Sequence, residues 1–177
     1  QKTAPFYMQT LWEGPDLTFG SSGIELADLD SDGDVDILYT NGDAFDNGFV
    51  NPSHGVQWLE NKGRLQFDYH RLTDLTGAYT ARVGDLDLDG DQDILVTVWL
   101  PADAEPKNVY DRTLASIICL EQTAPGEFAR HTLEQQTVIH AAVELADFDG
   151  DGDLDFVVGS HTLARGSDLP YWIAVWW

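Results

Sequence analysis

The sequence predicts an all-β fold made of repeated, four-stranded antiparallel sheets. A nine-residue acidic pattern, with aspartates at alternate positions and a glycine at the sixth, occurs at 28–36, 85–93 and 147–155. Short segments rich in Ile, Val, Leu and Phe flank each copy, as is typical of buried strands. No helical period is found, because Gly and Asp interrupt the chain too often. Repeats spaced by about 60 residues indicate a series of similar units.

The first two strands of each unit are expected on either side of the acidic pattern. One strand precedes the pattern and the next follows it, so the pattern forms the turn of a hairpin. The segments expected as strand one are 24–27, 81–84 and 142–146, and those expected as strand two are 36–40, 93–99 and 155–159.

Two further recurring segments mark the third and fourth strands. The third strands are expected at 56–61, 118–122 and 174–177. The fourth strands are expected at 67–72 and 128–133, which are 61 residues apart and share a histidine at their fourth position. The segment 6–11 lies another 61 residues upstream and has Gln9 in place of the histidine, so it predicts one isolated fourth strand.

Four antiparallel strands repeated at this length predict the blades of a β-propeller. We expect one propeller segment over 1–177, with about three blades. Its parts are the outer strand of a preceding or closing blade (1–19), blade 1 (20–76), blade 2 (77–137) and an incomplete blade 3 (138–177). Propellers use roughly four to eight blades. The chain is therefore expected to form an arc, which further blades of a parent chain or another copy would complete.

Each acidic pattern offers the ligands and the turn that a calcium loop needs. Calcium prefers about six to eight oxygen ligands in flexible geometry. Positions one, three, five and nine supply carboxylates, position seven supplies its backbone carbonyl, and the glycine at position six permits a sharp turn. The sequence predicts about three Ca²⁺ ions, one per loop. The predicted metal residues are Asp28, Asp30, Asp32, Asp34, Asp36, Asp85, Asp87, Asp89, Asp91, Asp93, Asp147, Asp149, Asp151, Asp153 and Asp155.

Other metals and other calcium folds fit these loops less well. Mg²⁺ keeps its waters and demands a stricter octahedron, and no cluster of Cys or His suits a softer metal. An EF-hand or dockerin-like module needs a glutamate at position twelve and flanking helices. Position twelve is instead Tyr39, Val96 or Val158, inside an expected strand. One copy would fit an ordinary surface turn, but three copies in register with the strands indicate metal binding.

The segments 26–38 and 144–158 resemble FG-GAP/VCBS repeats, which form the calcium-binding blades of the integrin alpha-subunit propeller. The segments 56–61 and 67–70 resemble those of bacterial members, and the resemblance covers nearly the whole chain. It implies a calcium-stabilised β-propeller, usually seven-bladed, in extracellular or periplasmic proteins. Such propellers serve in adhesion, in carbohydrate binding and as accessory domains of larger enzymes, so the resemblance alone does not fix the function.

Insertions at 41–55, 100–113 and 160–170 follow strand two and differ most between the units. Because successive strands alternate in direction, these insertions are expected on the rim opposite the acidic loops. A protein or carbohydrate ligand is expected there. Rim histidines that could contribute are His54, His140 and His161. The rim acids Asp43, Asp46, Asp103, Glu105, Asp111 and Asp168 are expected to be solvated.

Several other residue types are expected to be structural. His70 and His131 occupy equivalent positions in two units, and a catalytic residue is seldom duplicated in this way. Cys119 is expected to be a small buried apolar residue. Five tryptophans at strand positions favour packing between blades over stacking on sugars: Trp58, Trp99, Trp172, Trp176 and Trp177.

Composition narrows the class of protein. Hydrophobic residues make up 43% of the chain, enough for a packed core. A net charge of −22 argues against nucleic acid and anionic membrane surfaces as partners. The sequence has no run of 18 apolar residues, so no membrane insertion is expected. The acidity fits a secreted protein in a calcium-rich medium. The chain starts at Gln1 with neither Met nor a signal peptide, so a processed or excised segment is expected.

These observations favour a non-catalytic, calcium-binding scaffold for protein or glycan interaction. No G-x-S-x-G nucleophile elbow, phosphate loop or dinucleotide fingerprint is present, so no enzymatic activity is expected. Two alternatives stay open. The chain could be an accessory domain of a larger secreted enzyme that acts on polysaccharides or in redox chemistry, or copies of it could assemble into a complete propeller.

Overall fold

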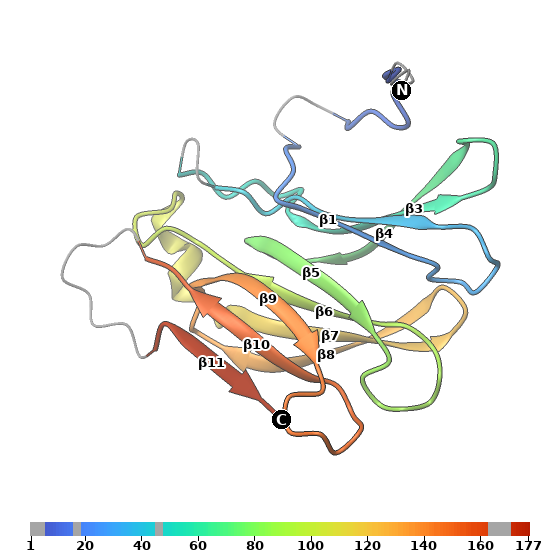
Figure 1. Cartoon of the computed structure of the whole chain (residues 1–177). Helices are drawn as coiled ribbons and strands as arrows, with labels where there is room; N and C mark the ends of the chain where they lie inside the picture. Colours follow the sequence, from blue (N-terminus) through green and yellow to red (C-terminus); the bar gives the residue numbers. More distant parts are fainter. Residues whose placement is uncertain (1–5, 16–18, 45–47, 163–170) are drawn as a thin grey trace.

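The computed structural model describes residues 6–15, 19–44, 48–162 and 171–177, and its architecture is all-β (Figure 1). The first sheet contains β1 (Gly23–Ala27), β2 (Asp36–Thr40), β3 (Gly55–Asn61) and β4 (Phe67–Asp74). The second contains β5 (Ala78–Gly84), β6 (Asp93–Val98), β7 (Ala115–Ala124) and β8 (Glu127–Gln135). The third contains β9 (His140–Ala146), β10 (Asp155–Ser160) and β11 (Ile173–Trp176). Among the described residues, the short 3₁₀ helix η1 (Lys107–Asp111) is the one helical element.

All three sheets are antiparallel and have up-and-down topology. Strands that are consecutive in the chain are neighbours in each sheet, in the orders β1-β2-β3-β4, β5-β6-β7-β8 and β9-β10-β11. The expected first, second, third and fourth strands of the repeat are therefore confirmed, with small differences at their ends: β5 begins earlier, at Ala78, and β6 ends one residue earlier, at Val98. Equivalent positions also pair alike, since Leu38 lies opposite Trp58 and Leu95 lies opposite Cys119.

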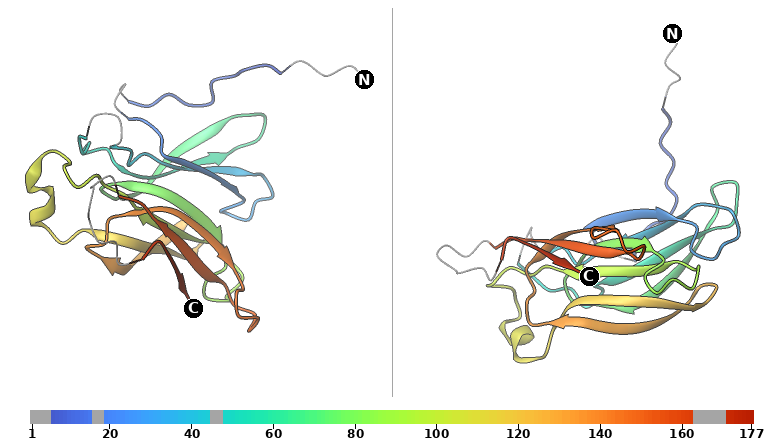
Figure 2. Two further views of the ribbon diagram at one scale, coloured as in Figure 1. Left: turned by 60° about the vertical axis from the view of Figure 1, so that its left-hand side comes forward. Right: turned by 60° about the horizontal axis from the view of Figure 1, so that its bottom comes forward.

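The isolated strand predicted at 6–11 is wrong. No strand occurs between residues 6 and 15, and Phe6 and Met8 are almost fully exposed, at 102% and 96%. A strand needs the hydrogen-bonding edge of a neighbouring strand, and the open edge at β11 belongs to the sheet at the other end of the row. The N-terminal segment runs away from the sheets instead (Figure 2). Only its inner part is anchored, where Trp12 stacks on Tyr69 with ring centroids 5.0 Å apart.

The hydrophobic core lies between the sheets. One cluster fills the space between the first and second sheets and includes Leu38, Val56, Ile94 and Val96. A smaller cluster joins the second and third sheets through Leu95, Ile117, Val143 and Val158. The first strands β1, β5 and β9 lie next to one another, with β5 in the middle. Within the described ranges the three sheets form an open row and do not close on one another.

The up-and-down topology separates two ends of the molecule. The acidic turns β1–β2, β5–β6 and β9–β10 lie at the right and lower right in Figure 1, whereas η1 and the connections after β2 and β6 lie at the left. The expected placement of the insertions opposite the acidic loops is thus confirmed for their described residues. No helix in the described part of the chain is long and apolar enough to cross a membrane.

Candidate metal centres

The three acidic loops share one hydrogen-bonding scheme. In each loop the carboxylate at position nine accepts the N–H of position two, the carboxylate at position one accepts the N–H of the position-six glycine, and the carboxylates at positions three and five accept the N–H groups of positions five and seven. The shared bonds measure 2.8–3.2 Å. These contacts orient the carboxylates of each turn toward its interior.

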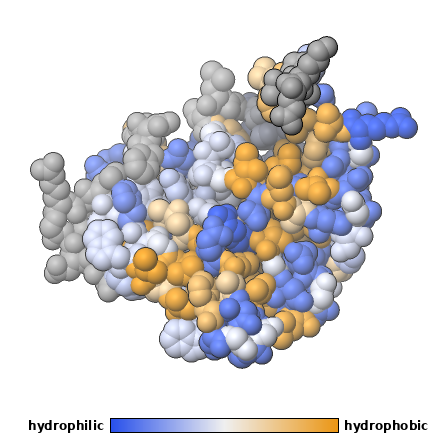
Figure 3. All heavy atoms as spheres, viewed as in Figure 1, coloured by the Kyte–Doolittle hydropathy of each residue, from blue (hydrophilic) through white to orange (hydrophobic). Residues whose placement is uncertain are grey.

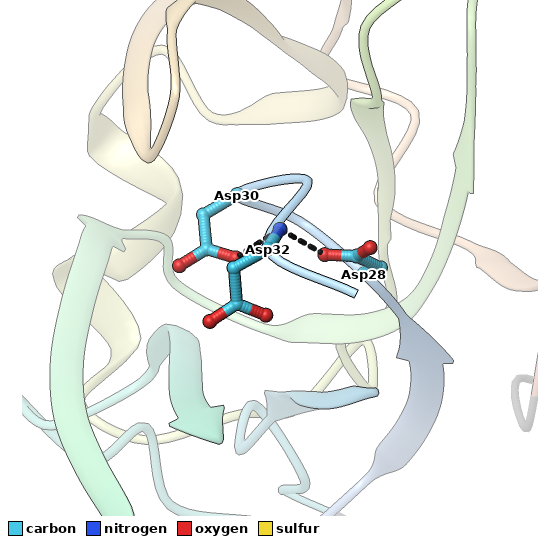
Figure 4. A group of neighbouring side chains, drawn as sticks. All are labelled: Asp28, Asp30 and Asp32. Atoms are coloured by element: carbon cyan, nitrogen blue, oxygen red, sulfur yellow. Dashed lines mark hydrogen bonds between the residues drawn. The ribbon is translucent and has the colours of Figure 1, made fainter. Parts of the chain in front are cut away.

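Three carboxylates converge in every loop. In the first loop they belong to Asp28, Asp30 and Asp32, as Figure 4 shows. In the other two loops they come from positions one, three and nine, namely Asp85, Asp87 and Asp93, and Asp147, Asp149 and Asp155. Within each group, one oxygen from each of the three carboxylates lies within 4.8 Å of the other two. Two calcium ligands on opposite sides of an ion are separated by about 5 Å, so each group can hold a metal ion.

In the first and second acidic loops, the carboxylate at position nine also ties the loop to the third strand of its sheet. Asp36 and Asp93 are 1% exposed. Besides the loop N–H, each accepts the backbone N–H of a third-strand residue, Asn61 at 2.7 Å and Gln122 at 2.9 Å. The side chains of Asn61 and Gln122 return a bond to the carbonyls of Val35 and Gln92. This link was not predicted from the sequence, although an amide residue at the end of both third strands was its visible signal.

The second loop contains charged oxygens without partners. The Oδ1 atoms of Asp85 and Asp91 are buried and accept no hydrogen bond. Burial, with the negative charge of Asp89 next in importance, raises the pKa of Asp91 to about 6. A buried carboxylate oxygen without a donor is costly, and a cation is the simplest ligand that would satisfy it. The donor set of this loop therefore fits a hard divalent ion.

The remaining predicted metal residues lie in the same three turns. Asp89 and Asp151 at position five are exposed, and each accepts a hydrogen bond from the backbone N–H two residues later. Asp34 and Asp153 at position seven were expected to act through their backbone carbonyls, which remains a prediction. The pKa of Asp153 is raised, first because its protonated carboxyl can donate a hydrogen bond to the carboxylate of Asp151 and then because of the negative charge of Asp151.

Two backbone positions in each loop adopt left-handed conformations. Gly33, Gly90 and Gly152 at position six have φ angles of 94°, 98° and 102°, which are strained for any other residue. Position four is also left-handed, which was not predicted from the sequence. There Ser31, Leu88 and Gly150 have φ angles of 60°, 65° and 84°. Only the third loop uses a glycine at this position, which was the available signal.

On the opposite rim, the insertions of the first and second sheets meet and enclose a cleft. The backbone N–H of Val50 donates to the carbonyl of Glu105 at 2.7 Å, and the N–H of Glu105 donates to the carbonyl of Gly48 at 2.6 Å. The cleft has a volume of about 420 Å³. Its lining mixes apolar and polar side chains: Val50, Asn51, Pro52, His54, Asp74, Leu75, Thr76, Pro106, Val109 and Arg112.

His54 forms part of the wall of this cleft and is 3% exposed. Its two ring nitrogens face backbone N–H groups, that of Asn51 at 3.3 Å and that of Gly77 at 3.4 Å. Burial is the main cause that lowers the pKa of His54 to about 4; the charge of Asp43 opposes this shift and that of Arg71 adds to it. A protonated ring would direct two N–H groups at two other donors, so His54 is neutral at physiological pH.

The other predicted rim residues are scattered. His140 is fully buried and bonds Glu134 at 2.6 Å, while Tyr171 stacks against it. His161 packs on the ring of Trp99. Asp103 and Asp111 are exposed, Asp43 and Glu105 are half-buried, and Asp46 and Asp168 lie outside the described residues.

The residues expected to be structural behave mostly as such. His70 and His131 make equivalent close contacts from their Nε2 atoms to a carboxylate oxygen, of Glu60 at 2.8 Å and of Glu121 at 2.7 Å. Trp58 and Trp99 are buried and Trp176 stacks on Phe156, but Trp172 and Trp177 are 68% and 88% exposed. Cys119 is half-buried, and burial raises the pKa of its thiol to about 12, so the thiol is inert.

Comparison with known proteins adds no relative. No protein-family model matches the chain, and no curated protein matches it.

Proposed function

We propose that this chain is a segment of a calcium-binding β-propeller of the FG-GAP/VCBS type, and that it acts as a non-catalytic scaffold for a protein or glycan ligand. The observation that carries the proposal is the identical bonding of three acidic loops at one end of three successive sheets. Four N–H groups in each loop orient carboxylates that would otherwise repel one another, and in the second loop two oxygens have no partner. Carboxylates held this close together, two of them with unpartnered buried oxygens, would be stabilised by the opposite charge of a bound cation.

The proposed calcium ligands are the carboxylates of positions one, three, five and nine and the carbonyl of position seven. In the third loop these are Asp147, Asp149, Asp151 and Asp155, with the carbonyl of Asp153. A bound calcium ion would neutralise the charge of the loop and hold the turn between strands one and two. Since all three loops are equivalent turns, the metal serves stability and not chemistry.

Two further features support a propeller and its location. The three sheets are up-and-down, lie side by side through β1, β5 and β9, and expose unpaired apolar faces at both ends of the row. This is the arrangement that an arc of blades would have. Three calcium-dependent loops in one strongly acidic chain favour a medium where calcium is abundant, and so an extracellular or periplasmic location.

Calcium titration tests the proposal directly. After removal of metal with EDTA, calorimetric titration should count three Ca²⁺ ions per chain, and each site should add about 2.7 kcal/mol of stability at 100 times its dissociation constant. Magnesium should restore little of the melting temperature. Asp149→Ala should leave two ions, whereas Asp111→Ala, which removes an exposed acid on the opposite rim, should leave three. An unchanged melt after confirmed metal removal would refute calcium binding.

The rim cleft is the proposed ligand site. It combines apolar walls with the Arg112 guanidinium, the Asp74 carboxylate and a neutral His54, a mixture suited to a polar ligand with an apolar face. Screening against a glycan array, followed by titration of the best binder, should give binding that Arg112→Ala weakens about tenfold or more. Arg64→Ala in the β3–β4 turn is the matched control. Equal affinity of both variants would place the ligand elsewhere.

A further inference from the structure

The outer surface of the first sheet is an exposed version of an interface that is buried elsewhere in the same chain. Three apolar side chains on this leading face, Ile24, Leu26 and Val35, are 64%, 62% and 54% exposed. Their equivalents in the third sheet pack against the second sheet: Val143 is 1% exposed, and Leu145 and Leu154 are half-buried. Figure 3 shows hydrophobic side chains gathered over β1.

The outer surface of the third sheet shows the complementary difference. Its apolar side chains Phe148, Ile173 and Val175 form a trailing face and are 50%, 72% and 38% exposed. The strand registers make them equivalent to Leu86, Ile117 and Cys119 of the second sheet, and Ile117 is completely buried at the junction with the third sheet.

The buried junction shows how closely such faces fit. A Cβ atom on Gly84 of the second sheet would lie 2.7 Å from Leu154 and 3.0 Å from Leu145 of the third. The leading face carries Leu26 and Val35 at these two positions, with no sheet against them. It also borders a hollow of about 490 Å³ lined by Leu11, Ile24 and Leu59. An apolar surface of this kind fits the flat side of another sheet.

Charge decides which sheet can occupy the leading face. Three residues before each acidic loop, the first strands carry Glu25, Arg82 and Glu144. Arg82 binds both neighbours across the two junctions, Glu25 at 3.4 Å and Glu144 at 2.6 Å. Residues at this position in adjacent sheets therefore lie in contact. A second copy docked by its trailing face would bring its Glu144 against Glu25, and two carboxylates in contact oppose binding.

We propose that the leading face is a docking surface for a four-stranded sheet of this same repeat that carries a lysine or arginine beside Glu25, and that Glu144 excludes an identical copy of the chain. The inference rests on one part of the proposed function, that the sheets are blades of a propeller, and it does not depend on calcium binding. Its readout is association between chains, so its failure leaves the metal sites untouched.

Charge-reversal variants test the proposal, and the quantity measured is the self-association of the full chain. The wild type presents Glu25 to Glu144 and should associate weakly in sedimentation velocity over a concentration series. Glu25→Lys and Glu144→Lys each create an opposite pair between copies, and each should associate at least about tenfold more tightly than the wild type. The double variant presents lysine to lysine and should return to weak association. Arg82 keeps one glutamate in each single variant, and thermal melts check that both fold.

Apolar substitutions test the surface itself. Added to Glu25→Lys, the change Leu26→Glu should abolish association, whereas Leu65→Glu in the β3–β4 turn, an equally exposed leucine, should leave it intact. The proposal is overturned if neither lysine variant associates, or if the double variant associates as tightly as the single ones. Association of the wild type as tight as that of the lysine variants would overturn the charge rule and make an identical copy the occupant.

Discussion

Leu88 in the second acidic loop has a left-handed backbone conformation that is unfavourable for a leucine. It has a φ of 65° and is 61% exposed. A leucine in the left-handed region costs about 1–2 kcal/mol because Cβ approaches the backbone. We predict that Leu88→Gly raises the free energy of unfolding by about 0.5–1 kcal/mol, after the loss of chain entropy that glycine brings. Urea denaturation of the metal-free protein measures it.

Val35→Gly is the matched control for this prediction. Val35 is also exposed and lies in an acidic loop, but it does not have a positive φ. Glycine at position 35 should therefore only add freedom to the unfolded chain and lower stability by about 0.5–1 kcal/mol. If both variants were destabilised alike, strain at Leu88 would not be the explanation.

His54 makes stability depend on pH. Its pKa is about 4 in the folded protein and 6.5 in the unfolded chain. Between these values the imidazole binds more protons in the unfolded state, so the contribution of His54 to stability falls as pH decreases from about 6.5 to 4. The full effect is about 3 kcal/mol. We predict that His54→Asn removes this portion of the decline, as measured by chemical denaturation at a series of pH values.

His131→Asn serves as the control for the pH series. His131 is largely exposed and pairs with Glu121 on the strand surface. Its replacement should leave the steep decline between pH 6.5 and 4 in place. Wild-type and His54→Asn profiles that run parallel over this window would contradict the burial argument for His54.

At the scale of the hairpin, the buried aspartate at position nine and the exposed aspartate at position five contribute differently to stability without metal. Asp93 joins the acidic loop to β7 through the N–H groups of Leu86 and Gln122. Asp89 accepts one exposed N–H, that of Asp91. In EDTA, we predict that Asp93→Ala lowers stability by about 3 kcal/mol, because two N–H groups lose a charged acceptor, and Asp89→Ala by under about 1 kcal/mol.

Calcium titration completes the comparison of these two variants. Both should lose the second site, since both remove a proposed ligand. Equal stability of Asp93→Ala and Asp89→Ala in EDTA would show that position nine has no structural role beyond the metal.

The strands beside the acidic loops could be predicted because each hairpin is encoded locally. The residues 24–40 contain both strands and the turn that pairs them, so pattern and structure agree. The segment 6–11 has a similar strand pattern but failed, because its pairing depends on a partner strand elsewhere. The left-handed position four was missed because Ser31 and Leu88 give no turn signal. The contacts of Arg82 with both neighbouring sheets could not be predicted from the sequence either, since they depend on how the sheets pack.

For the whole molecule, net charge is the property that calcium binding would change most. The three loops hold 15 of the 31 acidic residues, and three divalent ions would bring the net charge from −22 to −16. Within the loops, carboxylates already repel one another: after burial, the negative charge of Asp89 is the next largest cause of the raised pKa of Asp91. The metal-free chain should therefore be strained by self-repulsion at neutral pH, mainly along the rim where the three acidic loops lie.

Salt should relieve this strain only when metal is absent. At about 0.01 M ionic strength charges interact over roughly 30 Å, but at about 0.15 M over roughly 8 Å. We predict that this increase in NaCl raises the melting temperature in EDTA by about 2–4 °C, the equivalent of about 1 kcal/mol for a chain of this size. With saturating calcium the rise should be less than half as large, because the densest charge is neutralised. Choline chloride in place of NaCl should give the same result, since screening depends on ionic strength and not on sodium. Equal rises with and without calcium would mean that the acidic loops do not dominate the repulsion.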